Sequence, residues 1–189
     1  KKELSIWNDK VFTWNDFINK SKKSEDKLYE EKSLLHVHTC LEKLAKNHVN
    51  YFYNNLPTSE EWRLFKEFKN HSLYLDIETN GGDPISGFIT TIATYDGNEI
   101  KYYVNGKNLD DFIIDIFDYN ILITYNGKNF DIPFIQNFFN IQLNHAQIDL
   151  RYVLASLGFR GGLKSCEQQL GLRRYGLDGV DGYFAIHLW

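Results

Sequence analysis

The pattern of apolar and polar positions changes near residue 70. Before that point, apolar residues recur at helical spacing in three stretches. These are residues 13–19, which open with Thr13 as a helix cap, residues 25–50, and a short stretch from Ser59 to about Phe68. We expect one helix in each stretch and find no recognisable chemistry among them. The pattern therefore predicts a helical N-terminal region, residues 1–70, ahead of a second domain at 71–189.

After residue 70 the chain alternates in the manner of β-strands and then mixes strands with helices. Asp96-Gly97-Asn98 is typical of a tight hairpin, and Pro133 fits the first turn of a helix. We expect strands at 72–80, 88–96, 99–105, 120–126 and 146–149, and helices at 109–117, 130–140, 150–158 and 161–171. This order predicts an α/β layered domain.

Composition places the chain among globular proteins, with 43% hydrophobic and 24% charged residues. No apolar run approaches the roughly 20 residues that a membrane span needs. The start, KKELSIWND, lacks the apolar core of a signal peptide. The only two cysteines, Cys40 and Cys166, are far apart in sequence and do not make a disulfide scaffold. We therefore expect a cytoplasmic protein with no membrane partner.

The net charge of −4 argues against a general electrostatic attraction to nucleic acid, although a local basic groove stays compatible with it. A basic run does follow residue 159: Arg160, Lys164, Arg173 and Arg174. These side chains could line a groove for a phosphate backbone or could be ordinary charges at helix ends.

Two acidic residues occupy the first predicted strand. Asp76 and Glu78 are two positions apart, so their side chains share one face of the strand, about 7 Å apart along it. Carboxylates in an otherwise apolar strand repel each other unless a cation offsets their charge, and oxygen ligands suit Mg²⁺ or Mn²⁺. Taken alone, the pair is equally consistent with two solvent-facing acids at a strand end.

A third acid follows the buried strand at 120–126. In TYNGKNFDIPFI, residues 124–135, Asp131 lies just past the strand at a helix N-terminus, where α/β proteins gather their ligands. The alternative is that Asp131 caps its helix and that Asn126-Gly127 is an ordinary turn. If the two strands are neighbours, three carboxylates converge, which indicates a metal site. Two ions about 4 Å apart could stabilise both the attacking and the leaving oxygen of a phosphodiester.

These residues resemble a known family. The segments LDIET at 75–79 and YNGKNFDIPF at 125–134 are similar to the first two motifs of the DEDD (DnaQ-like) exonucleases, and in particular to the YprB-like ribonuclease H-like domain. Three further stretches match in order: HAQIDLR at 145–151, RGGLKSCEQQLG at 160–171 and GLDGVDGYFAIHLW at 176–189. The resemblance covers about residues 70–189.

The resemblance implies an RNase H-like mixed sheet of about five strands flanked by helices. It makes Asp76, Glu78 and Asp131 catalytic metal ligands for two Mg²⁺ or Mn²⁺ ions that hydrolyse phosphodiester bonds of DNA or RNA, often from the 3′ end. The family takes a fourth acid from a helix just beyond the matching Leu-Trp, whereas this sequence ends at Trp189. We therefore expect a C-terminally incomplete exonuclease domain that is weak or inert if it lacks that acid.

Further residues near these motifs are candidates for supporting roles. Thr79, Asn126, Lys128 and Lys164 are candidate substrate-binding residues. Asp149 begins a helix, so it is either the N-cap of that helix or a residue that supports the metal ligands from behind.

Three other functions compete with a metal-dependent nuclease. A nucleic-acid-binding scaffold of the same fold would bind a strand without cleaving it. A phosphatase of the haloacid dehalogenase type requires D-x-D-x-T, whereas Thr79 directly follows Glu78 here. A glycosidase requires two acids on opposite sides of a sugar bond, and two acids on one strand face do not provide that separation.

Overall fold

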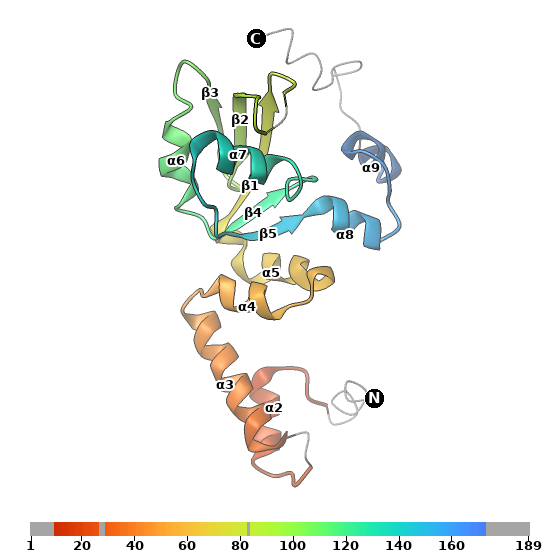
Figure 1. The fold of residues 1–189 in the computed structure, drawn as a ribbon. Helices are drawn as coiled ribbons and strands as arrows, with labels where there is room; N and C mark the ends of the chain where they lie inside the picture. Colours follow the sequence, from red (N-terminus) through yellow and green to blue (C-terminus); the bar gives the residue numbers. More distant parts are fainter. Residues whose placement is uncertain (1–9, 27–28, 83, 173–189) are drawn as a thin grey trace. The chain divides into compact units, whose positions relative to one another are not determined.

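The computed structural model describes residues 10–26, 29–82 and 84–172 (Figure 1). The chain divides into two compact units, Lys1–Tyr51 and Phe52–Trp189. The short helical segment that precedes the sheet therefore belongs to the second unit.

The first unit contains helices α2 (Trp14–Ser21) and α3 (Glu31–Ala45) and the first residues of α4 (Val49–Asn55). The predicted cap at Thr13 is confirmed. Its hydroxyl accepts a hydrogen bond from the backbone N–H of Asp16 at 3.1 Å, and the Asp16 carboxylate accepts one from the N–H of Thr13 at 2.9 Å. Each side chain thus satisfies an N–H that the first helical turn leaves without a partner.

The prediction of one continuous helix over 25–50 is wrong. The helix α3 begins at Glu31 and ends at Ala45, and a separate helix begins at Val49. Between them Asn47 has a φ of 51°, in the left-handed region that asparagine tolerates better than most residues. Apolar spacing continues across this break, so periodicity alone did not reveal it.

The second unit opens with short helical turns before the sheet. The single helix predicted from Ser59 to Phe68 is instead a 3₁₀-helix η2 (Thr58–Arg63) followed by α5 (Leu64–Phe68) and η3 (Lys69–His71). The side chains of Leu64 and Phe68 are buried, which holds this segment in place.

A five-stranded sheet forms the centre of the second unit, in the order β3-β2-β1-β4-β5. The strands are β1 (Ser72–Thr79), β2 (Ile89–Tyr95), β3 (Ile100–Val104), β4 (Ile121–Thr124) and β5 (Ala146–Asp149). The β1–β2 and β2–β3 pairs are antiparallel, whereas the β1–β4 and β4–β5 pairs are parallel. This mixed sheet confirms the expected RNase H-like arrangement.

The hairpin between β2 and β3 forms where the sequence predicts it. The Asp96 carboxylate accepts hydrogen bonds from the backbone N–H groups of Asn98 and Glu99, both at 2.8 Å. Gly97 has a φ of 100°, which a residue with a side chain rarely adopts. The turn chemistry therefore fixes the register of the antiparallel half of the sheet.

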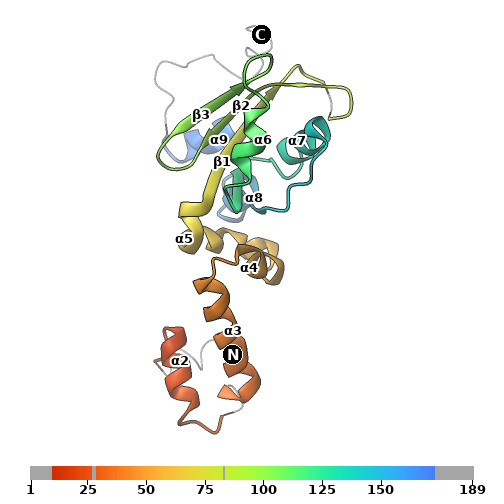
Figure 2. The same ribbon diagram turned by 90° about the vertical axis from the view of Figure 1, so that its left-hand side faces the viewer.

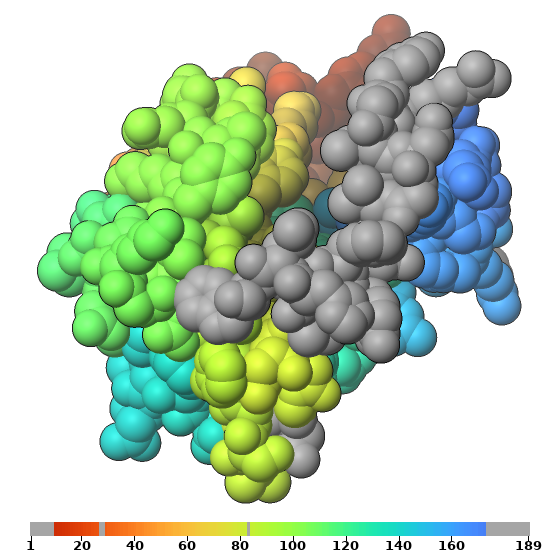
Figure 3. Space-filling model, turned by 90° about the horizontal axis from the view of Figure 1, so that it is seen from above, coloured from red at the N-terminus to blue at the C-terminus, as the bar shows by residue number. Residues whose placement is uncertain are grey.

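Helices cover the two faces of the sheet differently. The main core joins Leu73, Leu75 and Ile77 of β1 to the helices α6 (Asp111–Ile116) and α7 (Asp131–Phe139). Figure 2 shows α6 and α7 on one side of the sheet and α9 (Leu163–Gln169) on the other. Seen from above, residues 90–120 and α9 lie on opposite sides of this unit (Figure 3). The outer face of β1 is therefore left to its polar residues.

The structure also gives direct observations on membrane-spanning helices and on the two cysteines. Within the part of the chain that the structure describes, no helix has the length and apolar character needed to cross a membrane. Cys40 and Cys166 are both buried free thiols.

Candidate active site

The two faces of β1 differ as the alternating pattern predicts. Its inward residues pack in the core, whereas Asp76 is exposed and Glu78 is half-buried on the opposite face. Burial raises the pKa of Glu78 above its ordinary value, and the negative charge of Asp76 raises it further. The two carboxylates are thus close enough to repel each other.

The turn after β4 requires both a left-handed residue and a residue without a side chain, which Asn126 and Gly127 provide. Asn126 has a φ of 66°. Gly127 approaches β4 so closely that a Cβ atom there would lie 2.3 Å from the Thr124 hydroxyl oxygen. The Gly127 carbonyl accepts a hydrogen bond from the N–H of Ile132 at 2.9 Å. This compact turn places Asp131 as the first residue of α7.

The side chain of Asp131 points toward β1. The N-cap of α7 is Phe130, so the alternative that Asp131 is an ordinary helix cap does not hold. Asp131 Oδ1 instead accepts a hydrogen bond from the backbone N–H of Ile77 at 3.2 Å. Because the ladder between β1 and β4 ends at the Tyr74–Ile123 pair, the carboxylate satisfies an N–H that lies beyond that ladder. Asp131 is therefore joined to the strand that carries Asp76.

Asp131 is 5% exposed, and its charge has little compensation. Burial, followed by the negative charge of Asp76, raises the pKa of Asp131 to about 7. Among the described residues, no lysine, arginine or histidine forms an ion pair with its carboxylate. A buried carboxylate with an acidic neighbour and no basic partner is costly to keep ionised.

The three predicted acids do not form one tight cluster. They form two repelling pairs that share Asp76, one with Glu78 and one with Asp131. Across residues 10–26, 29–82 and 84–172, no three Asp, Glu, His or Cys side chains are close enough together to hold a metal ion. We expected the strand that carries Asp76 to lie beside the strand that precedes Asp131. The parallel pairing of β1 with β4 confirms this.

Asp149 connects the turn to the next helix. It is 2% exposed, and it caps α8 (Leu150–Ser156) by accepting a hydrogen bond from the N–H of Arg151 at 3.0 Å. The same carboxylate accepts hydrogen bonds from the N–H of Asn126 at 2.7 Å and of Lys128 at 3.2 Å. Asp149 is thus both the predicted helix cap and an anchor for the turn that presents Asp131.

The candidate substrate-binding residues lie in different settings. The buried Thr79 accepts a hydrogen bond from the N–H of Gly81 at 3.2 Å. Lys128 Nζ lies 2.5 Å from Glu61 Oε2 and 5.5 Å from the centre of the Tyr53 ring. Burial alone would lower the pKa of Lys128, but these two neighbours raise it above its ordinary value. Lys128 is therefore held by the segment before the sheet.

Asn126 and Lys164 complete this set. The Asn126 side-chain oxygen accepts a hydrogen bond from the Arg151 guanidinium, whereas Lys164 is exposed on α9. Arg173, Arg174 and the motif at 176–189 lie outside the described residues.

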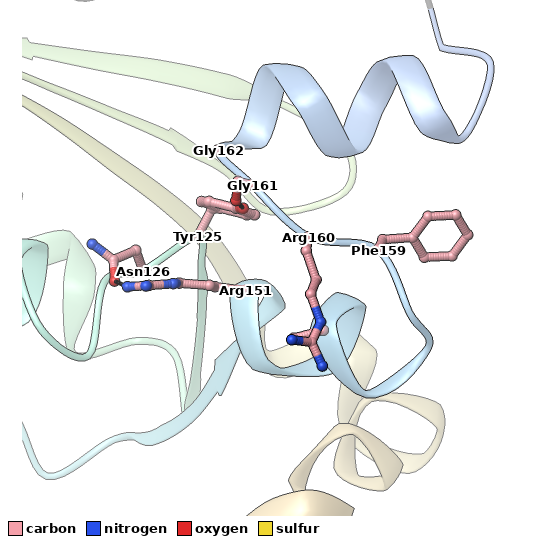
Figure 4. A pocket seen from close by; sticks show the side chains of 8 residues that line it. Tyr125, Asn126, Arg151, Phe159, Arg160, Gly161 and Gly162 are labelled. Atoms are coloured by element: carbon pink, nitrogen blue, oxygen red, sulfur yellow. Dashed lines mark hydrogen bonds between the residues drawn. The ribbon is translucent and has the colours of Figure 1, made fainter.

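Two hollows meet at Tyr125. An open groove of about 310 Å³ runs over the outer face of the sheet and contains Asp76, Tyr74 and Tyr95. A cavity of about 520 Å³ lies between the end of β4 and the segment from α8 to α9, and two arginines, Arg151 and Arg160, line it (Figure 4). Tyr125 lines both hollows.

Sequence reasoning included Arg151 in the matching stretch at 145–151 but did not assign it a functional role. The signal that could have found it is its position two residues after a buried aspartate at a helix start. The structure adds that this position brings the guanidinium to Asn126, 25 residues earlier in the chain.

Comparison with solved structures gives low similarity. The family B DNA polymerase of Pyrobaculum calidifontis matches with a TM-score of 0.47 and 17% identity, over 62% of this chain and 20% of the polymerase. A structure described as the apo form of a nuclease matches with a TM-score of 0.43 and 16% identity, over 67% of this chain and 63% of that one. NrnC of Brucella melitensis matches with a TM-score of 0.39 and 16% identity, over 62% of this chain and 61% of NrnC.

The chain thus spans less than two thirds of the length of each of these proteins. No curated protein shows significant similarity to the sequence. Residues 73–189, however, match the sequence profile of the RNase H superfamily. That match covers the sheet, the turn after β4 and all three predicted acids, and the chain therefore belongs to the RNase H superfamily.

Proposed function

We propose that this chain is a metal-dependent nuclease that hydrolyses phosphodiester bonds of DNA or RNA. The observation that carries the proposal is the buried carboxylate of Asp131. It lies beside Asp76, and no basic side chain among the described residues forms an ion pair with Asp131. A fold of the RNase H superfamily supplies the context for this chemistry. A divalent cation would relieve the repulsion between these acids.

The residues present fit a hydrated ion better than a closed protein cage. Mg²⁺ keeps several water ligands and is commonly bound by one or two carboxylates together with substrate phosphates. Asp76 and Asp131 would provide such a pair, with Glu78 on the same strand face as Asp76. This also accounts for the absence of a three-residue metal group among the described residues. Mn²⁺ accepts the same oxygen ligands.

We propose that two ions bind. They would activate a water molecule and stabilise the leaving oxygen of the cut bond. The chain's own residues hold the site in place for this chemistry. The N–H of Ile77 orients Asp131, and Asp149 fixes the turn before it. Glu78, whose pKa is raised, would accept a hydrogen bond from the attacking water. We assign Thr79, Asn126 and Lys164 to the binding of the strand, and 3′-to-5′ polarity to its degradation.

Cleavage of 5′-labelled single-stranded DNA and RNA tests the proposal. The full chain is incubated with each strand in Mn²⁺, and EDTA and Asp76→Asn serve as controls. A ladder of shortened products that disappears in both controls is expected, and a ladder of products that retain the 5′ label supports 3′-to-5′ polarity. If Asp76→Asn cleaves as fast as the natural sequence, the site lies elsewhere.

A second candidate function is a scaffold that binds nucleic acid without cleaving it. The absence of a three-residue metal group among the described residues favours it. Retention of a labelled strand without cleavage, in Mg²⁺ as well as in Mn²⁺, would support the scaffold and contradict the nuclease.

A further inference from the structure

We infer that the cavity between Arg151 and Arg160 binds a phosphate group of the nucleic-acid strand, at a position away from the bond that is cut. This inference rests on the proposed function. It assigns a ligand to a hollow in which none of the three predicted acids lies.

Segments far apart in the sequence build the cavity. Tyr125 and Asn126 come from the end of β4, Arg151 comes from the start of α8, and Arg160, Gly161 and Gly162 come from the loop before α9. Tyr125 donates a hydrogen bond from its hydroxyl to the carbonyl of Gly161 at 2.6 Å, which ties that loop to the sheet. The walls are therefore fixed to one another by hydrogen bonds.

Two arginines that are exposed to solvent line the cavity. Arg151 extends toward Asn126, whose side-chain oxygen accepts a hydrogen bond from it, and Arg160 hangs from the loop on the near side of α8 (Figure 4). Among the residues that the structure describes, none that lines the cavity is acidic, and neither arginine forms an ion pair. A guanidinium group presents paired N–H donors that match two oxygens of one phosphate.

The size and position of the cavity favour a phosphate that belongs to a strand. Its volume of about 520 Å³ lies within the range of small-molecule sites and leaves room for the attached sugar. Tyr125 also lines the groove that contains Asp76, so the cavity and the groove adjoin at this residue. A strand with one phosphate at Asp76 would therefore have a neighbouring phosphate in reach of the arginines. The phosphate could be an internal diester of that strand or its terminal phosphate.

Binding measured without metal separates this site from the carboxylates. The probe is a nine-nucleotide single-stranded DNA with a fluorescent label, titrated with the full chain in EDTA and followed by anisotropy. Arg151→Gln/Arg160→Gln should weaken binding at least about tenfold, because charged hydrogen bonds to the strand are lost. For a single strand, the slope of log K against log salt should also become shallower by about 0.7 for each phosphate contact removed.

A charge-matched variant controls for the loss of positive charge alone. Lys69→Gln/Lys107→Gln removes two exposed lysines from segments that do not line the cavity. It should change affinity by less than about twofold, since exposed charges distant from a ligand are screened by salt. Equal weakening in both double variants, at equal thermal stability, would overturn the inference.

Neutral phosphate analogues locate the contact without relying on a variant that must fold. A set of strands carries one uncharged methylphosphonate each, with and without a 5′-terminal phosphate. One position should reduce affinity for the natural sequence but not for the double arginine variant. Its place in the strand distinguishes an internal diester from a terminal phosphate. If no position behaves in this way, the cavity does not bind phosphate.

The outcomes distinguish this inference from the proposed function. Arginine-dependent binding without cleavage would support the phosphate site and contradict the nuclease. Cleavage that is unaffected by both arginine substitutions, together with unchanged binding, would support the nuclease and contradict the phosphate site.

Discussion

Two aspartates on neighbouring helices of the same unit have opposite surroundings. Asp115 of α6 accepts hydrogen bonds from Lys101 Nζ at 2.8 Å and from the Tyr103 hydroxyl at 2.6 Å, and these partners lower its pKa. Asp131 of α7 has no basic partner among the described residues, and burial beside Asp76 raises its pKa to about 7.

The difference distinguishes a carboxylate that stabilises the fold from one that does not. Asp115 is compensated within the protein, so its ionised form is favourable as the structure stands. Asp131 is placed by a glycine turn and by Asp149 where its ionised form is unfavourable, and such arrangements are typical of functional sites. We interpret the missing compensation at Asp131 as the place of a metal ion.

The largest expected difference between the two aspartates is in activity. Asp131→Asn should reduce cleavage at least about 100-fold, because the charge that would hold the ion is lost while the shape is kept. Asp115→Asn should leave cleavage within about twofold, since Asp115 lies in a separate ion pair with Lys101. Initial rates with a 5′-labelled strand check both values. Equal losses would show that the comparison carries no functional information.

Asp149 tests whether the placement of Asp131 depends on the anchored turn. Asp149→Asn leaves one acceptor oxygen for three backbone N–H groups, so we expect a loss of about 1–3 kcal/mol in the free energy of unfolding. Cleavage should fall about 10–100-fold, as for other residues that orient metal ligands.

The matched control for this substitution is Asp96→Asn. Asp96 also accepts backbone hydrogen bonds, but in the exposed β2–β3 hairpin, where asparagine is a favourable turn residue. It should be nearly neutral in both urea unfolding and cleavage. A neutral Asp149→Asn would show that Asp149 is only a helix cap of little consequence.

The pH dependence of stability should carry the signature of Asp131. Its pKa is raised from 3.8 to about 7 in the folded protein, so its contribution to stability is complete below about pH 4 and is lost as the pH rises through 7. In EDTA, Asp131→Asn should therefore be more stable than the natural sequence at pH 8, by about 1–4 kcal/mol, and similar to it at pH 4.5. Urea unfolding at the two pH values measures this. A variant that is less stable at pH 8 would contradict the uncompensated charge.

The smallest effect is expected for the stability of Asp115→Asn. The Lys101–Asp115 pair is partly exposed, with side chains that are 43% and 32% accessible. Pairs of this kind contribute about 0–1 kcal/mol. The hydrogen bond from Tyr103 can pass to the asparagine oxygen, so the midpoint of urea unfolding should move only slightly. A larger loss would show that Asp115 is as important to the fold as Asp131 is to the site.

The sequence predicted the local parts of this molecule well. Alternation separated the two faces of β1, because the period of two is a property of the strand itself. The Asn126-Gly127 turn and the cap at Asp149 were also visible, since both depend on neighbouring residues. The break at Asn47 was missed because the apolar spacing continues through it.

Long-range partners could not be predicted in this way. Lys128 pairs with Glu61, which lies 67 residues earlier in the chain, and Arg151 meets Asn126 only after the sheet has formed. Neither pairing leaves a periodic signal. The sequence likewise placed three acids in one cluster, whereas the structure brings them together as two pairs around Asp76.

The most direct test of the account is calorimetric titration with Mn²⁺ at pH 8, using the natural sequence, Asp131→Asn and Asp115→Asn. We predict that the natural sequence and Asp115→Asn bind the ion with the same affinity, and that Asp131→Asn loses measurable binding. Binding of Mn²⁺ by Asp131→Asn with unchanged affinity would contradict the claim that the uncompensated carboxylate is a metal ligand.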